Sequence, residues 1–202
     1  MTSEFDRWEA RFAAPEYLFG TEPNEFLREQ APLLPAHGRA LAVADGEGRN
    51  GVWLAEQGLD VLSVDFSPKA QAKAQALAKS RGVSLRTERV DLTTWNWPTA
   101  AFDVVAAIFI QFATPEERRS IFAGMRKALK PRGLLLMQGY RPEQLAYKTG
   151  GPSQIENLYT KAMLMEAFAG FADLKISEHD SMTQEGAGHS GMAALIDLVG
   201  RK

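Results

Sequence analysis

The chain has 202 residues, of which 45% are hydrophobic and 24% charged, a composition typical of globular proteins that argues against disorder or a coiled coil. Its formal net charge of -2 offers no basic surface for a phosphate backbone, so nucleic acid is not expected as a partner. The lack of cysteine excludes disulfides, thiolate metal sites and a cysteine nucleophile, and three scattered histidines predict no metal site.

Residues 1–37 precede the first predicted strand and contain Trp8, Phe12, Tyr17, Phe19 and Phe26. So many aromatic side chains predict a cap that folds back over the carboxyl end of a sheet. The first twelve residues have mixed charge and lack the basic start and apolar core of a signal peptide. No apolar run approaches the roughly 20 residues that a membrane span needs. We therefore expect a cytoplasmic protein without membrane contact.

From Gly38 onward, short apolar runs alternate with helical stretches, which predicts βαβ units around a doubly wound, Rossmann-like parallel sheet of the α/β class. The predicted strands are residues 39–44, 60–65, 84–90, 102–109 and 133–139. A helix is expected to begin near Val52. Two more are predicted over 68–79, capped by Ser67, and over 115–129, which starts with Thr114 and a proline.

After the fifth strand, residues 140–157 form a long Gly- and Pro-containing connection, which we interpret as a functional loop such as a lid. A helix over 160–168 and strands over 172–178 and 192–199 follow, the strands as a closing antiparallel pair around a Gly- and Ser-rich turn. One domain is expected over 1–202, with a cap (1–37), a cofactor-binding core (38–139) and a substrate-side region (140–202).

The most informative segment is Gly46-x-Gly48-x-x-Gly51, which lies between a predicted strand and a predicted helix. Glycines permit positive φ and a close approach of ligand to backbone, and the first amides of a helix favour an anion. The same spacing also fits a dinucleotide fingerprint or a plain structural turn. Asp65 ends the second strand, where a carboxylate can accept hydrogen bonds from the two hydroxyls of a ribose. This position fits two cofactor classes equally, NAD and S-adenosylmethionine.

A second acid separates the two cofactor classes. Asp91 ends the third strand, where it is placed to accept from an adenine amine while Leu92 packs on the ring. This favours S-adenosylmethionine over NAD, although a turn or cap aspartate is the alternative role. A dinucleotide module also needs a further catalytic domain, for which this chain has no room.

With these residues, the sequence resembles the class I S-adenosylmethionine-dependent methyltransferases, in particular small bacterial tellurite-resistance and thiopurine-type enzymes. The resemblance spans nearly the whole chain. It is carried by Tyr17-x-Phe19-Gly20-x-Glu22-Pro23-Asn24, Gly46-Glu47-Gly48-Arg49-Asn50-Gly51, Val64-Asp65-Phe66-Ser67-Pro68, Phe102-Asp103-Val104-Val105, Leu129-Lys130-Pro131-Arg132-Gly133 and Glu185-Gly186-x-Gly188-His189-Ser190-Gly191. It implies a seven-stranded sheet whose last strand is antiparallel.

The resemblance also implies where the methyl donor binds: its amino-acid end at the glycine turn, its ribose at Asp65 and its adenine near Asp91. Two positions depart from the family, since Ala42 replaces the usual acid and Ala44 the first glycine. Asp45 or Glu47 is the expected substitute partner for the donor's ammonium group. The predicted cofactor-binding residues are Ala44, Asp45, Gly46, Gly48, Arg49, Asn50, Asp65, Phe66, Asp91, Leu92 and Ile108.

Methyl transfer from a sulfonium is an in-line displacement, which mainly requires alignment of the reactants in a dry pocket. A base is needed only for a protonated acceptor, and His189 is the predicted one, with a backbone-bonded turn histidine as the alternative. Tyr17 is a second catalytic candidate beside Phe19, although core packing would explain either ring. The predicted substrate-binding residues are Phe19, Gln111, Arg141 and Tyr159.

The expected acceptor is a small molecule, in particular a thiol or metalloid anion, and the expected assembly is a monomer or homodimer. Two other functions remain open on the sequence. Ala42 and Ala44 are compatible with a binding module that holds the nucleoside without catalysis. The glycine spacing is compatible with a nicotinamide-dependent reductase.

Overall fold

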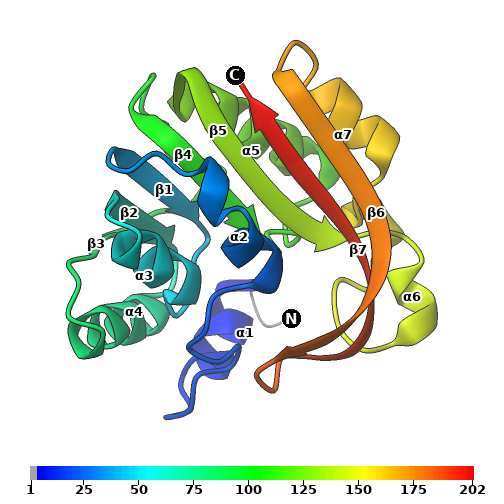
Figure 1. Cartoon of the computed structure of the whole chain (residues 1–202). Coiled ribbons are helices and arrows are strands. Elements are labelled where there is room, and N and C mark those ends of the chain that lie inside the picture. Colours follow the sequence, from blue (N-terminus) through cyan, green and yellow to red (C-terminus); the bar gives the residue numbers. More distant parts are fainter. Residues whose placement is uncertain (1–3) are drawn as a thin grey trace.

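A computed structural model describes residues 4–202, which form a seven-stranded sheet in the order β3-β2-β1-β4-β5-β7-β6 (Figure 1). Parallel pairing joins β1 to β2 and β4, β2 to β3, and β4 to β5. Strand β7 is antiparallel to both β5 and β6, which confirms the predicted sheet with its antiparallel last strand. The bounds are β1 Arg39–Val43, β2 Asp60–Asp65, β3 Arg86–Arg89, β4 Phe102–Ile108, β5 Leu129–Tyr140, β6 Ala172–Glu185 and β7 His189–Arg201.

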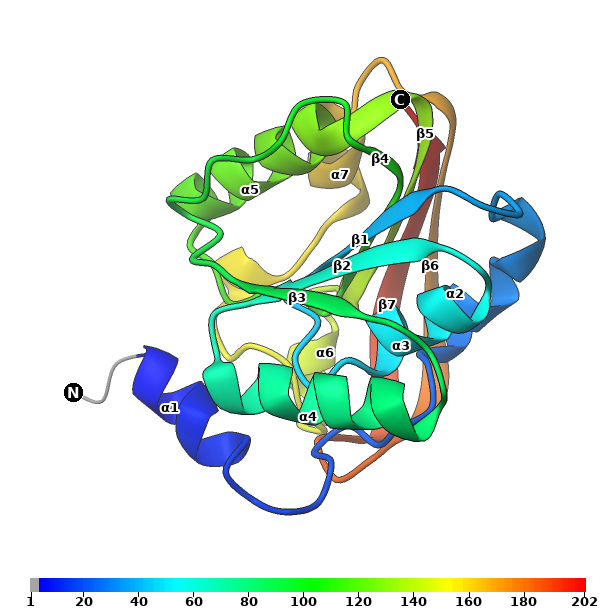
Figure 2. The ribbon, with the colours of Figure 1, turned by 90° about the vertical axis from the view of Figure 1, so that its left-hand side faces the viewer.

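Helices cover both faces of this sheet, as Figure 2 shows for α5 and α7 on one side and α3 and α4 on the other. The cause is visible in β1, where Leu41 and Val43 belong to one apolar cluster and Ala40 and Ala42 to another. The helices are α1 Glu4–Arg11, α2 Glu25–Glu29, α3 Arg49–Glu56, α4 Pro68–Ser80, α5 Pro115–Ala128, α6 Gln144–Tyr147 and α7 Lys161–Ala167, with 3₁₀ turns at Ala31–Leu33 and Ile155–Asn157.

The two predicted helix starts with proline are confirmed. Ser67 accepts a hydrogen bond from the Ala70 amide at 3.1 Å, and Thr114 forms a reciprocal capping box with Glu117. The helix expected near Val52 begins three residues earlier, because Gly48 takes the left-handed conformation and serves as the N-cap of α3.

The β6–β7 hairpin is longer than predicted. The Gly- and Ser-rich segment expected as a turn is mostly strand, since paired residues continue to Glu185 opposite His189. Solvent exposure alternates along β6, as expected for a strand with one more exposed face. The alternation continues through polar residues, which do not resemble the apolar run of a buried strand. Only residues 186–188 are left for the turn.

The predicted cap is present only in the first part of the segment before β1, where Trp8, Phe12 and Phe19 face the cavity described below at the carboxyl ends of the strands. Phe26 and Leu27 of α2 instead pack into the apolar cluster that contains Ala40 and Ala42. The first three residues of the predicted cap lie outside the described residues. The connection after β5 contains α6 and a 3₁₀ turn instead of being wholly irregular. None of the helices within residues 4–202 has the length and apolar character that crossing a membrane requires.

Candidate functional site

A cavity lies where the carboxyl ends of β1, β2 and β4 meet the segment before β1. Polar groups come from the turn after β1 and the end of β2, whereas the opposite walls are aromatic. Its lining residues are Trp8, Phe12, Phe19, Ala42, Val43, Ala44, Asp45, Gly46, Arg49, Asn50, Asp65, Phe66, Ala106, Ile108, Phe109, Phe112 and His189. In open parallel sheets, ligands bind at this end of the strands.

The turn after β1 has three alternate residues in the left-handed region: Ala44 (φ 47°), Gly46 (φ 58°) and Gly48 (φ 88°). Glycine is required at position 48 because a Cβ there would lie 2.5 Å from the Cβ of Ala74 in α4. Ala44 holds the same backbone conformation with a side chain, at a cost of about 1–2 kcal/mol. The strained residue lies in the cavity wall.

Asp65, the last residue of β2, connects β2 to this turn. One carboxylate oxygen accepts from the Gly46 amide and the other from the Ser67 amide, both at 2.9 Å. Burial raises the pKa of Asp65, and the hydrogen bonds from Ser67 and Gly46 oppose that rise. A carboxylate oxygen that accepts one hydrogen bond can accept another, so this group can still bind a ligand hydroxyl.

Of the two acids expected to replace the missing carboxylate at Ala42, only Asp45 lines the cavity. Asp45 accepts from Ser63 Oγ at 2.8 Å and from the Gly51 amide at 3.1 Å. Burial raises its pKa to about 7. Glu47 instead accepts from the Leu18 amide at 2.7 Å and from Lys73 Nζ at 2.6 Å.

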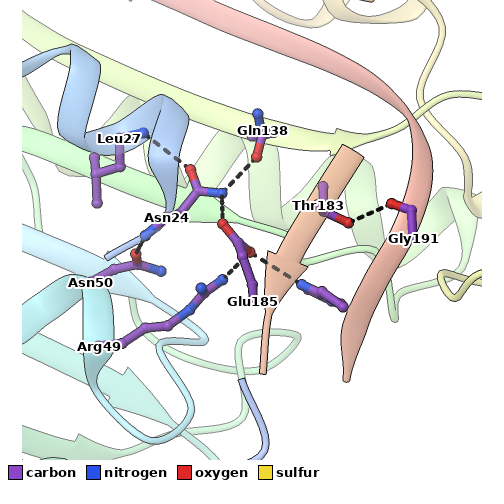
Figure 3. A network of polar contacts seen from close by, with 9 residues as sticks. Asn24, Leu27, Arg49, Asn50, Gln138, Thr183, Glu185 and Gly191 are labelled. Carbon is purple, nitrogen blue, oxygen red and sulfur yellow. Dashed lines mark hydrogen bonds and ion pairs between the residues drawn. The ribbon is translucent and has the colours of Figure 1, made fainter. Parts of the chain in front are cut away.

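A buried polar network connects the glycine turn to the hairpin and to the segment before β1 (Figure 3). Arg49 Nη2 donates to Glu185 Oε2 at 2.7 Å. The side-chain Nδ2 of Asn24 donates to Glu185 Oε1 at 2.9 Å and to Gln138 Oε1 at 2.7 Å. The backbone N–H of Asn24 donates to Asn50 Oδ1 at 2.9 Å. These groups come from the N-cap of α2, from α3, from β5 and from β6, so together they fix the geometry of the cavity wall.

Arg49 has a buried donor that makes no hydrogen bond within the part of the chain that the structure describes. Its side chain is 7% exposed, and its Nη1 atom is buried without a hydrogen-bond partner among the described residues. Because a buried donor left unpaired costs about 1–3 kcal/mol, such an atom in a cavity wall fits an anionic ligand. The guanidinium, the Asp65 carboxylate and the aromatic walls together fit a nucleoside that carries a carboxylate.

His189 is the first residue of β7 and 8% exposed, so its predicted place in a loose turn was wrong. Its ring packs between Phe19 and Phe109, with centroid distances of 4.5 Å and 4.4 Å. Burial lowers the pKa of His189, and the positive charges of Arg49 and Arg11 lower it further, against an opposing effect of Glu185. The imidazole is therefore neutral near pH 7.

Three predicted cofactor residues lie outside the lining. Gly48 packs against Ala74, as described above. Asp91 is exposed and accepts from the Thr93 amide at 2.9 Å, which is the turn-aspartate alternative left open by the sequence. Leu92 is buried in the main apolar cluster. The remaining predicted cofactor residues Ala44, Asp45, Gly46, Arg49, Asn50, Asp65, Phe66 and Ile108 all line the cavity.

The predicted acceptor residues are dispersed. Tyr17 donates to the Lys73 carbonyl at 3.1 Å and packs beside α4, whereas Phe19 lines the cavity. Gln111 lines an outer hollow next to the cavity, but its side chain holds the backbone of Tyr140. Arg141 pairs with Glu143 and Asp180, and Tyr159 is buried in the main apolar cluster.

Sequence reasoning missed four lining or supporting residues. Phe109 has φ 56°, which turns its ring toward His189 and Tyr140, and Phe112 lies in the same wall. Asn24 and Glu185 stood within the quoted family motifs but received no role. Their position at a cap and before a glycine turn was the available signal.

Comparisons with known proteins agree with this geometry. Residues 40–133 match the family model described as a methyltransferase domain. A glycine/sarcosine N-methyltransferase from Parasynechococcus marenigrum (strain WH8102) is 33% identical over 145 residues, which cover 67% of this chain and 48% of that protein. The chain thus spans about half the length of this curated relative.

Two solved structures share the fold. TehB from Haemophilus influenzae superposes with a TM-score of 0.70 at 15% identity, covering 98% of this chain and 66% of that one. Phosphoethanolamine N-methyltransferase 2 from Haemonchus contortus, in complex with S-adenosyl-L-methionine, gives a TM-score of 0.70 at 18% identity, covering 96% and 57%.

Proposed function

We propose that residues 40–133, which match the model of a methyltransferase domain, form a class I, S-adenosylmethionine-dependent methyltransferase domain, and that the chain transfers a methyl group to a small-molecule acceptor. The observation that carries the proposal is the cavity itself. It brings the strained glycine turn, the carboxylate of Asp65 and the unpaired Arg49 Nη1 together at the carboxyl ends of the strands.

The residues of this wall suit the three polar parts of the donor. Because all three residues line the cavity and Arg49 Nη1 has no hydrogen-bond partner in the described part of the chain, we expect Asp65 to accept from ribose hydroxyls, Arg49 Nη1 to donate to a carboxylate, and Asp45 to face an ammonium group. A charge-assisted hydrogen bond to a buried guanidinium is among the stronger polar contacts in proteins. When bound, S-adenosylmethionine supplies an electrophilic methyl group on a sulfonium.

The aromatic residues of the opposite wall exclude water from the site and present electron-rich faces. Trp8 and Phe12 stack at 5.4 Å, and Phe19 lies between Trp8 and His189. Ring faces attract a cation within about 6 Å, and a dry pocket strengthens this attraction. The segment before β1 therefore contributes directly to binding and does not serve only as a cover.

For the acceptor we propose a small amine. The glycine/sarcosine relative is named for N-methylation, and a neutral imidazole lines both the cavity and the outer hollow that leads to it. His189 Nε2 takes the proton that the acceptor nitrogen must lose. A thiolate or a metalloid anion, which the sequence favoured, would arrive without such a proton and would not need the base.

Methyl transfer from radiolabelled S-adenosylmethionine to a panel of amines, thiols and metalloid oxyanions tests both parts of the proposal. We expect labelled product with at least one amine, and a His189→Gln variant that retains donor binding while losing turnover by about a hundredfold or more. Calorimetric binding of the donor without turnover across the panel would instead indicate a binding module. Binding of NADPH alone would indicate a reductase.

A further inference from the structure

Glu185 is the centre of the network in Figure 3, and nothing in the family motif explains its contacts. It ends β6, and the hairpin register places it directly opposite His189. Its Oε2 atom lies 2.7 Å from Arg49 Nη2 and 3.4 Å from His189 Nδ1. Its Oε1 atom accepts from Asn24 Nδ2 at 2.9 Å. One carboxylate thus contacts the donor-side guanidinium and the candidate base together.

The ionisation state of Glu185 decides what His189 does. Burial alone would raise the pKa of Glu185, but the hydrogen bond from His189 and the charge of Arg49 outweigh it and hold the pKa at about 2. The group is therefore a carboxylate near neutral pH, and a carboxylate only accepts hydrogen bonds. The neutral imidazole that contacts it must carry its proton on Nδ1.

We propose that Glu185 is a positioning residue, which holds His189 in the Nδ1-protonated tautomer so that the Nε2 lone pair is free for the acceptor proton. The inference rests on the proposed function only insofar as His189 is the base. An outer partner that donates or accepts at one ring nitrogen commonly sets the tautomer used at the other.

The hairpin turn makes this pair rigid. Gly186 has φ 63°, and a Cβ there would lie 2.5 Å from the Leu18 carbonyl oxygen. The Gly188 amide donates to the same carbonyl at 2.9 Å. A Cβ on Gly188 would lie 2.3 Å from the Phe19 ring, which itself packs on His189. The turn between the two residues is therefore pressed against the segment before β1.

The titratable groups around His189 come from four elements. Arg11 of α1 and Arg49 of α3 are both positive, and Glu185 of β6 is the carboxylate that opposes them. Tyr140 of β5 packs edge-on at 5.8 Å as a neutral phenol, because burial raises its pKa. Removing the charge of Glu185 leaves two cations acting on the imidazole, so its pKa should fall.

A purely structural role is the alternative, in which Glu185 only fastens Asn24 and Arg49. ¹⁵N NMR of the imidazole rings separates the two roles without any acceptor, and the chain has three histidines to resolve. We expect the wild-type His189 to show the Nδ1-protonated tautomer. In Glu185→Gln we expect a mixture of tautomers and a His189 pKa lower by about one unit.

A matched control lies in the same hairpin. His179 Nε2 contacts Asp197 Oδ2 at 2.8 Å, so Asp197→Asn should move the His179 signals and leave those of His189 in place. Asn24→Ala removes a partner of Glu185 without touching His189 and should also leave the tautomer unchanged. Should Glu185→Gln fail to fold, Glu185→Asp keeps the charge on a shorter side chain, and we expect a mixed tautomer there as well.

Kinetics complete the test if transfer is found. Glu185→Gln should lower kcat by about ten- to a hundredfold and shift the acid limb of the kcat/KM profile to lower pH, while donor affinity changes less. A folded Glu185→Gln or Glu185→Asp protein whose His189 keeps the wild-type tautomer and pKa would overturn the proposal. The NMR outcome stands whether or not methyl transfer is observed, so the two failures are distinguishable.

Discussion

The carboxylate of Asp65 accepts a hydrogen bond from the backbone amide of Gly46 at 2.9 Å, which fastens the end of β2 to the turn after β1. The contact joins a carboxylate to the glycine turn, and both line the cavity. Since Ser67 holds the second oxygen at 2.9 Å, the carboxylate cannot rotate freely. The orientation needed for a diol is therefore set before a ligand binds.

Asp65→Ala should weaken binding of S-adenosylmethionine by roughly 1–3 kcal/mol, through loss of charge-assisted hydrogen bonds. Calorimetry gives the affinity directly. Asp60→Ala is the matched control at the opposite end of the same strand, where the side chain pairs with Arg86 in solvent. We expect that variant to bind the donor normally. Equal affinities for all three proteins would remove Asp65 from the site.

Ala44→Gly should stabilise the protein by up to about 1 kcal/mol, because glycine occupies the left-handed region without the penalty of a Cβ. Urea unfolding measures the change. The comparison variant is Ala42→Gly, at a buried position inside β1, which should be less stable than wild type. If both substitutions destabilise the chain to a similar degree, Ala44 is not strained.

Asp45 should make the stability of the folded chain depend on pH in an unusual direction. Its pKa rises from 3.8 to about 7 on folding, so its contribution is complete below pH 4 and is lost as the pH increases to 7. Each pKa unit between the folded and unfolded states corresponds to about 1.4 kcal/mol in the free energy of unfolding. The free energy of unfolding of wild type, relative to Asp45→Asn, should therefore fall between pH 4 and pH 7.

Asp103→Asn is the comparison variant, because the contribution of Asp103 to the free energy of unfolding should depend on pH in the opposite direction. Burial of Asp103 is outweighed by hydrogen bonds from the Arg39 amide and from Lys130, which lower its pKa. Its contribution is present above pH 4 and lost as the pH falls further. A pH profile of Asp45→Asn that parallels wild type between pH 4 and pH 7 would contradict the raised pKa of Asp45.

Gly188→Ala should displace the Phe19 ring, since the new Cβ would lie 2.3 Å from it. Overpacking of this kind costs about 1–3 kcal/mol, and we also expect donor affinity to fall because Phe19 lines the cavity. Gly82→Ala is the control: it has φ 70° and open space around a Cβ, so it strains the backbone without touching the site. Normal affinity in Gly188→Ala would show that Phe19 does not contribute.

Much of the fold was predictable because it depends on local patterns. The bounds of β2 and the starts of α4 and α5 follow from apolar runs, capping residues and proline. The closing antiparallel pair was predicted too, but its length was not, because the length depends on cross-strand pairs such as Glu185 and His189, which no single strand displays. Strand period alone does not show where two strands stop pairing.

The site, like the fold, was predictable only where it depends on local sequence patterns. The glycine turn and Asp65 were predictable because strand and helix geometry brings them together. Tyr17 and Phe19 lie two residues apart in an irregular segment, and only the fold shows that Phe19 faces the cavity and Tyr17 faces α4. The contact between Asn24 and Gln138 joins residues 114 positions apart, which no local pattern signals.

A crystal structure with S-adenosylhomocysteine, the demethylated product, tests the central claim most directly. We predict the nucleoside at the carboxyl ends of β1, β2 and β4, with its ribose hydroxyls on Asp65 and its carboxylate on Arg49 Nη1. Density for the compound elsewhere on the molecule, or an empty cavity at saturating concentration, would contradict the account.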